Sequence, residues 1–261
     1  MSPTEQGAQR STLAAALASP SVREALVLWT VSFASIVAAS LRMPGYAKVV
    51  ATISFLYLPL FFARSSRLRG GTKNSWWERF WSFDYAEFGV TLRNWRVDLK
   101  LALLLFLIVA PLYLAAYVGY AEAIKWLPAR WAIHLSPYGG HWGFHPRLPG
   151  HFGLWAIDQM LVVAVPEEFF YRGYLQTRFR EAWPQGRTFV GARLGPAFFV
   201  TAVLFAVGHL AIFQFWRLAV FFPALLFGWL RERTGTVLGS SVLHALFNLY
   251  EMVLRASFYP V

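Results

Sequence analysis

The sequence predicts an all-α fold: a polytopic integral membrane helical bundle with about seven to eight transmembrane helices. Hydrophobic residues make up 57% of the 261 positions and charged residues only 14%. Soluble domains usually carry about 25% charged residues. The twelve tryptophans fit the aromatic belts that form at membrane–water interfaces. The lipid bilayer is therefore the expected environment of the chain.

Seven stretches approach the length of about 20 mostly apolar residues that a transmembrane helix needs. They are residues 24–41, 46–63, 99–120, 152–175, 195–212, 214–231 and 236–255. The first two are separated only by RMPGYAK, so they are expected to form a helical hairpin. Pro59, Pro111 and Pro223 lie inside these stretches, where membrane helices tolerate kinks.

The basic residues predict the orientation of the chain. Of the 24 Lys and Arg residues, 17 fall in the tail and the segments that alternate with it, and 7 fall on the other side. By the positive-inside rule the N-terminus is cytoplasmic. Because these residues flank apolar spans, the net charge of +11 does not indicate nucleic acid as a partner. An Arg- and Ala-rich composition favours a multi-pass protein of a bacterial inner membrane.

Three regions are expected along the chain. Residues 1–23 form a polar N-terminal tail, in which TLAAALA is too short and weakly apolar for a typical signal peptide. Residues 24–98 form the N-terminal hairpin followed by an interfacial amphipathic segment. Residues 99–255 form the membrane core that carries the candidate functional residues.

The interfacial segment is predicted from aromatic spacing. Trp76 with Phe80, and Trp77 with Trp81, are four residues apart, so each pair shares a helix face. A helix that lies on the inner membrane surface fits this pattern. The alternative is a soluble loop with a chance cluster of aromatic residues.

Four histidines occur in a Pro- and Gly-rich segment between the third and fourth spans: His134, His141, His145 and His151. Such a cluster can indicate a metal site. Because no carboxylate or thiolate accompanies them at ligand spacing, we interpret them as ordinary loop histidines. The absence of cysteine from the chain also excludes disulfides, thiol nucleophiles and Cys-ligated zinc.

Ionisable residues inside the fourth span are the first sign of function. An ionisable group at the centre of a membrane helix costs roughly 2.5–3.5 kcal/mol on insertion scales, so Glu167, Glu168 and Arg172 should face the bundle interior. Glu168 and Arg172 have the i, i+4 spacing of an ion pair, whereas Glu167 is rotated by about 100° and stays available. The alternative is that the helix ends here and the charges lie among lipid headgroups.

Two later spans carry polar pairs at the same spacing. Phe205 and His209 share one helix face, and His244 and Asn248 share another. A lone histidine in a span is more often a packing residue. Together with the two glutamates, these residues supply the parts for hydrolysis: a carboxylate that takes a proton from water, a histidine that orients it and an amide that donates to an oxyanion.

These three motifs resemble those of a known family. EEFFYR matches an EExxxR motif, FAVGH matches FxxxH, and HALFN matches HxxxN. In this order, each inside an apolar span, they resemble the CPBP family of CAAX-protease and bacteriocin-processing membrane proteins, over about residues 99–255. The resemblance implies an intramembrane endopeptidase with about eight helices, whose substrate is a membrane-associated protein or peptide cleaved near its C-terminal or membrane-proximal end.

The resemblance also implies roles for individual residues. Glu167 becomes the general base, His209 helps to position the water, and His244 with Asn248 stabilises the oxyanion. The remaining motif residues, Glu168, Arg172 and Phe205, are supporting. The family has been described both as metalloproteases and as glutamate proteases. We expect no metal cofactor, because Glu168 is expected to be paired with Arg172. The alternative is a zinc ion held by Glu167, Glu168, His209 and His244.

Other classes of protein fit the sequence less well. A zinc protease of the site-two type needs an HExxH motif, which this sequence lacks. A rhomboid-type serine protease is disfavoured because no GxSxG motif occurs and because Ser240 and Ser241 lie on the same helix as His244. Asp158 is the one aspartate inside a span, whereas an aspartyl protease needs two. A non-catalytic scaffold or bacteriocin-immunity protein stays open, as does a transporter, although we see no inverted repeat.

Overall fold

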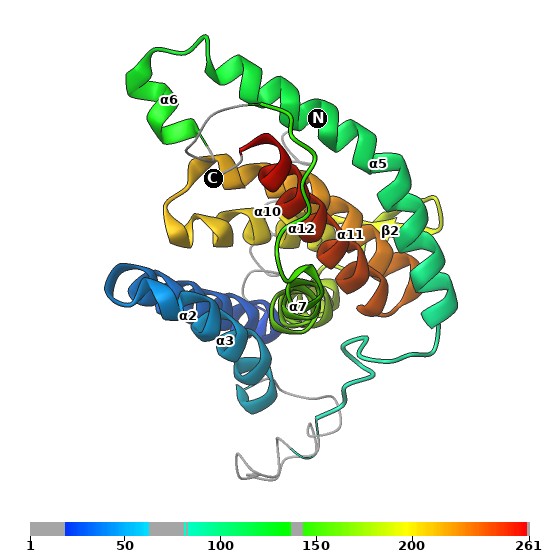
Figure 1. Cartoon of the computed structure of the whole chain (residues 1–261). Helices are drawn as coiled ribbons and strands as arrows, with labels where there is room; N and C mark the ends of the chain where they lie inside the picture. The colour runs from blue at the N-terminus through cyan, green and yellow to red at the C-terminus, as the bar shows by residue number, and fades with distance from the viewer. Residues whose placement is uncertain (1–18, 63–80, 82, 137–142, 260–261) are drawn as a thin grey trace, which may run out of the picture.

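The computed structural model describes residues 19–62, 81, 83–136 and 143–259, and it is built almost entirely from helices (Figure 1). The first part of the chain contains α2 (Pro20–Arg42), η1 (Pro44–Tyr46), α3 (Ala47–Phe62), α5 (Trp95–Ile124) and α6 (Ala129–Leu135). The central part contains α7 (Phe152–Asp158), η3 (Gln159–Ala164), α8 (Val165–Glu168), η4 (Phe169–Leu175) and α9 (Gln176–Ala182). The last part contains β1 (Arg187–Phe189), β2 (Ala192–Leu194), α10 (Pro196–Gly208), η5 (His209–Ile212), η6 (Phe215–Val220), α11 (Phe221–Thr234) and α12 (Leu238–Phe258).

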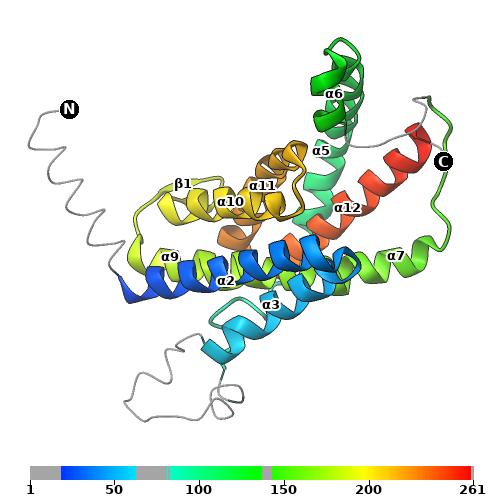
Figure 2. The same ribbon diagram turned by 90° about the vertical axis from the view of Figure 1, so that its left-hand side faces the viewer.

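The segments α7 to α9 form one continuous helix at the centre of the fold. The backbone keeps right-handed helical angles at each junction between them. Figure 2 shows these segments as a single rod with α2 beside it, and Figure 1 looks down the rod from α7. The rod also contacts α3, α10, α11 and α12, so side chains on its different faces meet different neighbours.

The winding of this rod changes around Pro166. The segments η3 and η4 on either side of α8 are π-helical, a form that is rare and often found at functional sites. Pro166 has no N–H and cannot donate to the carbonyl of Val162, four residues earlier. The hydroxyl of Thr52 on α3 donates to that carbonyl instead, at 2.8 Å. A side chain of the neighbouring helix α3 therefore pairs with the carbonyl oxygen that Pro166 cannot bind, as is required of backbone groups inside a membrane.

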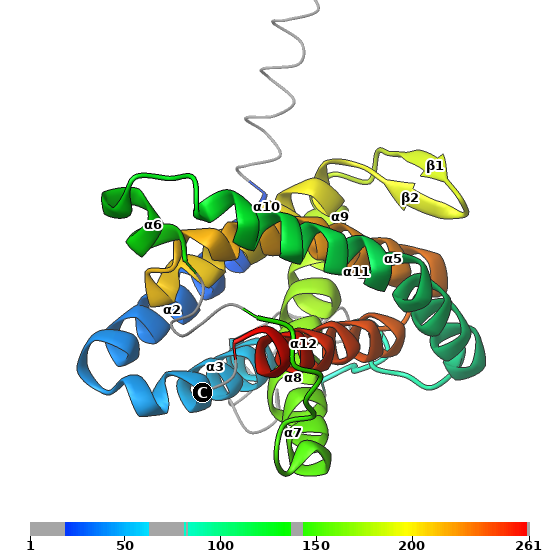
Figure 3. The same ribbon diagram turned by 45° about the horizontal axis from the view of Figure 1, so that its top comes forward.

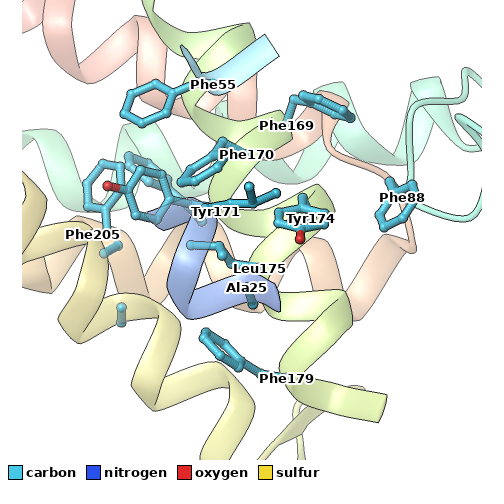
Figure 4. Packing of buried hydrophobic residues seen from close by; sticks show 14 of the residues in the cluster. Ala25, Phe55, Phe88, Phe169, Phe170, Tyr171, Tyr174, Leu175, Phe179 and Phe205 are labelled. Carbon is cyan, nitrogen blue, oxygen red and sulfur yellow. The ribbon is translucent and has the colours of Figure 1, made fainter. Parts of the chain in front are cut away.

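The core beside this rod is rich in aromatic side chains. Phe170 and Tyr171 project from η4 toward Phe55 of α3, with ring centroids 4.8 and 5.6 Å from that of Phe55. Tyr171 also meets Phe205 of α10 edge-to-face at 4.9 Å. Figure 4 shows this cluster between the three helices. This close packing directly after Glu167 and Glu168 fixes the part of the rod that carries them.

Three helices are long and apolar enough to cross a membrane: Pro20–Arg42, Pro44–Phe62 and Trp95–Ile124. In the third, only 6% of the most apolar window is buried inside the protein. An apolar surface of this extent suits contact with lipid. The mainly helical fold, with helices capable of crossing a membrane, is thus confirmed for the described residues, while the total of seven to eight spans stays a prediction.

Several predicted spans differ from the helices observed. The span 195–212 is divided into α10, which ends at Gly208, and a 3-10 turn, η5; the span 214–231 begins with another 3-10 segment, η6. The span 99–120 lies within the longer α5. These corrections arise because mean hydropathy does not register where helical winding changes.

Two elements were absent from the predicted fold. The hairpin β1–β2 pairs Arg187 with Leu194 in antiparallel register and projects from the bundle in Figure 3. The short helix α6 lies in the segment interpreted as a loop.

Some predictions fall outside the described residues. The tail up to residue 18, Trp76, Trp77, Phe80 and His141 are among these positions. Trp81 is described and is 70% exposed. The division of the chain at residues 24 and 99 stays a prediction.

Candidate active site

A buried ion pair lies at the centre of the candidate site. Arg172 Nη1 is 3.0 Å from Glu168 Oε1, and the two side chains are 1% and 0% exposed. The interaction predicted from the i, i+4 spacing is therefore present. Arg172 Nη2 also donates to the backbone carbonyl of Ala224 on α11, at 3.1 Å. The motif thus connects the central rod to α11.

Two aromatic rings enclose the guanidinium of Arg172. Its Cζ lies 4.2 Å from the ring centroid of Phe205 and 5.1 Å from that of Phe227. Both phenylalanines are almost fully buried. Cation–π contacts of this kind gain strength where water is excluded. Phe205 therefore has the supporting role expected for it, and Phe227 is a partner that no sequence motif indicated.

His244 of α12 joins the same network. Its Nδ1 is 2.9 Å from Glu168 Oε1, and its ring stacks on Phe227 with a centroid distance of 4.9 Å. In its ion pair with Arg172 the Glu168 carboxylate acts as the acceptor, so Nδ1 of His244 donates this hydrogen bond. The opposite ring nitrogen, Nε2, then faces Glu167, with 3.9 Å between it and Glu167 Oε2.

Glu167 differs from its neighbour in burial and in partners. Its side chain is 18% exposed, while that of Glu168 is 0% exposed. Its Oε2 is buried and accepts no hydrogen bond from the described residues. Each glutamate has a buried Oε2 without a hydrogen bond from the described residues, but only Glu168 is paired through its Oε1 with Arg172 and His244, and only Glu167 is partly exposed.

His209 lies at the junction of α10 and η5. Its Nδ1 is 2.9 Å from the backbone carbonyl of Phe205. Because a carbonyl oxygen only accepts, Nδ1 donates, and Nε2 of the neutral ring is left as an acceptor. Its ring packs on Phe205 at 4.6 Å, and the ring of His244 approaches Phe205 at 5.9 Å. Phe205 therefore separates and orients the two histidines.

Asn248 occupies a neighbouring position, one helical turn beyond His244. Its Nδ2 donates to Gln159 Oε1 at 2.9 Å, and Gln159 Nε2 donates to Asp158 Oδ2 at 3.1 Å. Asp158 in turn pairs with Lys48 of α3 at 2.8 Å. This polar chain fixes the amide of Asn248 and leaves its second N–H for another acceptor.

Gln159 and Arg217 also contribute to the site, although no motif contains them. Gln159 lies eight residues before Glu167, about two helical turns, and its polarity within an apolar span was an available signal. Arg217 of η6 is half-buried and interacts electrostatically with both Glu167 and His209. Its position depends on the chain reversal after α10, which hydropathy does not reveal.

The side chains expected to hold zinc in the alternative interpretation are largely engaged with one another. Glu168 binds Arg172 and His244, and Nδ1 of His209 binds a backbone carbonyl. Across the residues that the structure describes, no three His, Asp or Glu side chains are arranged to hold a metal ion. This donor set does not fit a closed zinc site, which takes four ligands.

Comparisons with known proteins agree with the motifs. Residues 149–250 match the family model "Type II CAAX prenyl endopeptidase Rce1-like", and this segment contains all three motifs. No curated protein and no solved structure matches the chain. The match and the three described helices that are long and apolar enough to cross a membrane support a membrane protein in which residues 149–250 are similar to a protease family. This match agrees with the resemblance of the three motifs to the CPBP family of CAAX-type membrane proteases.

Proposed function

We propose that the protein is an intramembrane endopeptidase in which Glu167 activates the water that hydrolyses a peptide bond. The observation that carries the proposal is the pair of unequal glutamates beside His244. Glu168 is fully buried in an ion pair with Arg172, whereas Glu167 is 18% exposed and its Oε2 faces His244 without a hydrogen bond from the described part of the chain. A general base needs such a free oxygen within reach of its proton donor.

The distance between Glu167 and His244 suits a bridging water. Two acceptors 3.9 Å apart can each lie about 2.8 Å from one water oxygen. Such a water donates one proton to Glu167 Oε2 and the other to His244 Nε2, and its lone pair faces the substrate. In this proposal His244 orients the water directly, a role that the resemblance gave to His209. The Nε2 atom of His209, whose ring packs on Phe205, is a further acceptor.

The reaction then proceeds as general base catalysis. Glu167 takes a proton from water as the oxygen attacks the peptide carbon, and the carbonyl oxygen becomes an oxyanion. The free amide N–H of Asn248 donates to that oxyanion. Glu167 returns the proton to the leaving nitrogen as the C–N bond breaks. The products are a new carboxyl terminus and a new amine.

Replacing Gln159 by leucine tests the role given to Asn248. Leucine removes the acceptor that holds the amide of Asn248, so the oxyanion donor loses its orientation. We expect kcat to fall roughly 10-fold with little change in KM, less than the 10²–10³-fold loss of a donor itself. Steady-state kinetics measures this, with Lys48→Gln as a control at the exposed end of the polar chain. A rise in KM with unchanged kcat would show that Gln159 acts on substrate binding instead.

We further propose that catalysis requires no metal, because Glu168, one of the four side chains that zinc would use, is paired with Arg172 and His244. Treatment of the purified enzyme with EDTA or 1,10-phenanthroline is expected to leave more than about half of its activity. Elemental analysis of the same sample should find less than one metal ion per chain. Loss of activity with both chelators, followed by recovery with added zinc, would contradict this proposal.

The substrate is proposed to be a membrane-associated protein cleaved near its C-terminus. The family match supports this class, since its description names CAAX prenyl endopeptidases. We also propose a bacterial inner membrane as the location, with the N-terminus in the cytoplasm, from the distribution of basic residues. The test is cleavage of an S-farnesyl CAAX peptide by the purified full-length chain, with the new termini identified by mass spectrometry. Intact peptide after prolonged incubation with a folded enzyme would count against CAAX-type cleavage.

A further inference from the structure

Arg217 lies beside the proposed catalytic groups on a separate part of the chain. It belongs to η6, which follows η5 after a reversal in which Phe213 adopts a left-handed backbone conformation. His209 begins η5, and the two short helices pack together. The reversal therefore brings the arginine back toward the end of α10, where the catalytic side chains meet.

The guanidinium of Arg217 is oriented but has no acidic partner. Its Nε donates to Gln214 Oε1 at 2.6 Å, and its Cζ lies 5.0 Å from the ring centroid of Trp216. Among the described residues, no carboxylate forms a salt bridge with it, whereas Arg172 and Arg178 both have such partners. With Nε engaged, the two terminal nitrogens are left as a pair of parallel donors.

The charge of Arg217 acts on the proposed base. Electrostatic interactions join it to Glu167 and to His209. The other cation that acts on Glu167 is Arg172, which is enclosed by rings and bound to Glu168. Arg217 is half-buried, whereas the side chain of Arg172 is only 1% exposed. It is therefore the cation that an incoming substrate can reach.

We propose that Arg217 binds the free C-terminal carboxylate of the substrate and thereby sets the position of the cleaved bond. A guanidinium with two parallel donors matches a carboxylate in bidentate geometry. Partial burial strengthens this pairing compared with an arginine in water.

This inference rests on the proposed function and makes it more specific. An anchored carboxylate holds the end of an extended chain, and each residue of such a chain spans about 3.3–3.6 Å. The separation between Arg217 and Glu167 then determines how many residues leave after cleavage. Binding through the carboxylate favours substrates that are cut close to their true C-terminus over internal segments of membrane proteins.

The test compares two forms of one peptide. The full-length protein in phosphatidylcholine nanodiscs is given an S-farnesyl cysteine peptide that ends in valine, isoleucine and alanine, either as the free acid or as the C-terminal amide. We expect kcat/KM to be roughly 10- to 100-fold higher for the acid, the range typical of a hydrogen-bonded charged pair. Arg217→Gln is expected to lower kcat/KM much more for the acid than for the amide, so that the preference disappears, and Arg217→Lys should retain part of the preference.

Arg130→Gln serves as the matched control. Arg130 is an exposed arginine on α6, a helix that contacts η6. Its replacement by glutamine removes one positive charge, as Arg217→Gln does, at a position near η6. This variant should keep the full preference for the acid. Equal cleavage of acid and amide by the wild type would overturn the proposal, and so would an equal loss for both peptides in Arg217→Gln, which would indicate that Arg217 acts on Glu167 alone.

Two further arms separate this proposal from its alternatives. In nanodiscs containing phosphatidylglycerol the preference for the acid should persist; its loss there would mean that Arg217 binds a lipid phosphate.

The second arm measures the binding of fluorescent forms of both peptides to Glu167→Gln, in which no turnover is expected. Tighter binding of the acid that depends on Arg217 supports the carboxylate site even if the wild type cleaves neither peptide, an outcome that counts against the proposed function alone. Equal binding overturns the carboxylate site.

Discussion

Replacement of Glu167 by glutamine is expected to lower kcat/KM for peptide cleavage by at least about 10³-fold. Glutamine keeps the size of the side chain and can still hydrogen-bond to water, but it cannot take the proton. General base catalysis contributes about 10²–10⁴-fold, and the same group also returns the proton to the leaving nitrogen. Steady-state cleavage of a farnesylated peptide by purified protein measures the effect.

The control for this variant is Glu122→Gln. Glu122 lies on α5, where it pairs with Lys125 and is half exposed, so its replacement should leave the rate unchanged. Thermal unfolding of all variants shows whether each remains folded. Activity of Glu167→Gln within a few fold of the wild type would mean that another group activates the water.

Replacement of Arg172 by leucine is expected to have the largest effect on stability. It leaves Glu168, which is 0% exposed, without its cation, and it removes the hydrogen bond to Ala224. Loss of one partner of a buried ion pair typically costs about 3–5 kcal/mol. Unfolding of the detergent-solubilised protein, followed by circular dichroism, should show a decrease of this size.

Two comparisons give this result its meaning. Lys125→Gln breaks a half-exposed pair and should change the free energy of unfolding by less than about 1 kcal/mol. The double variant Glu168→Gln with Arg172→Leu removes both charges and should recover part of the loss, because no unpaired charge stays buried. A change below about 1 kcal/mol for Arg172→Leu alone would show that Glu168 is neutral or finds another partner.

Local spacing made part of the site predictable. Glu168 and Arg172 lie four residues apart on one helix, and the sequence therefore predicts their ion pair, which the structure confirms. The same reasoning predicts that Glu167 points elsewhere. The likeness of the three motifs to those of a known family was confirmed by the match of residues 149–250.

Contacts between distant segments were beyond this reasoning. The bond from Thr52 to the Val162 carbonyl and that from Asn248 to Gln159 join residues about 90 to 110 positions apart, and no local pattern indicates which helices pack together. Phe227 is one of 24 phenylalanines, and nothing in its local sequence distinguishes it as the ring that stacks on His244.

Helix ends were also poorly predicted, and this affects the site. Mean hydropathy continues past Gly208, but α10 ends there and the chain turns through η5 and η6. The resulting reversal carries His209 and Arg217 to the same region. Hydropathy overestimates the length of continuous helices for the same reason, since an apolar stretch can turn back before it crosses the bilayer.

The central claim is that the protein hydrolyses peptide bonds of membrane proteins with a water molecule that Glu167 activates. The most direct test compares protein termini in membrane fractions of cells that express the wild type or Glu167→Gln at equal levels. We predict a specific set of new C-termini, with the complementary released peptides, that appears in the wild type and disappears in the variant; those termini would identify the substrates. Identical termini in both strains, with a deletion phenotype that Glu167→Gln still rescues, would contradict catalysis and indicate a scaffold or immunity protein.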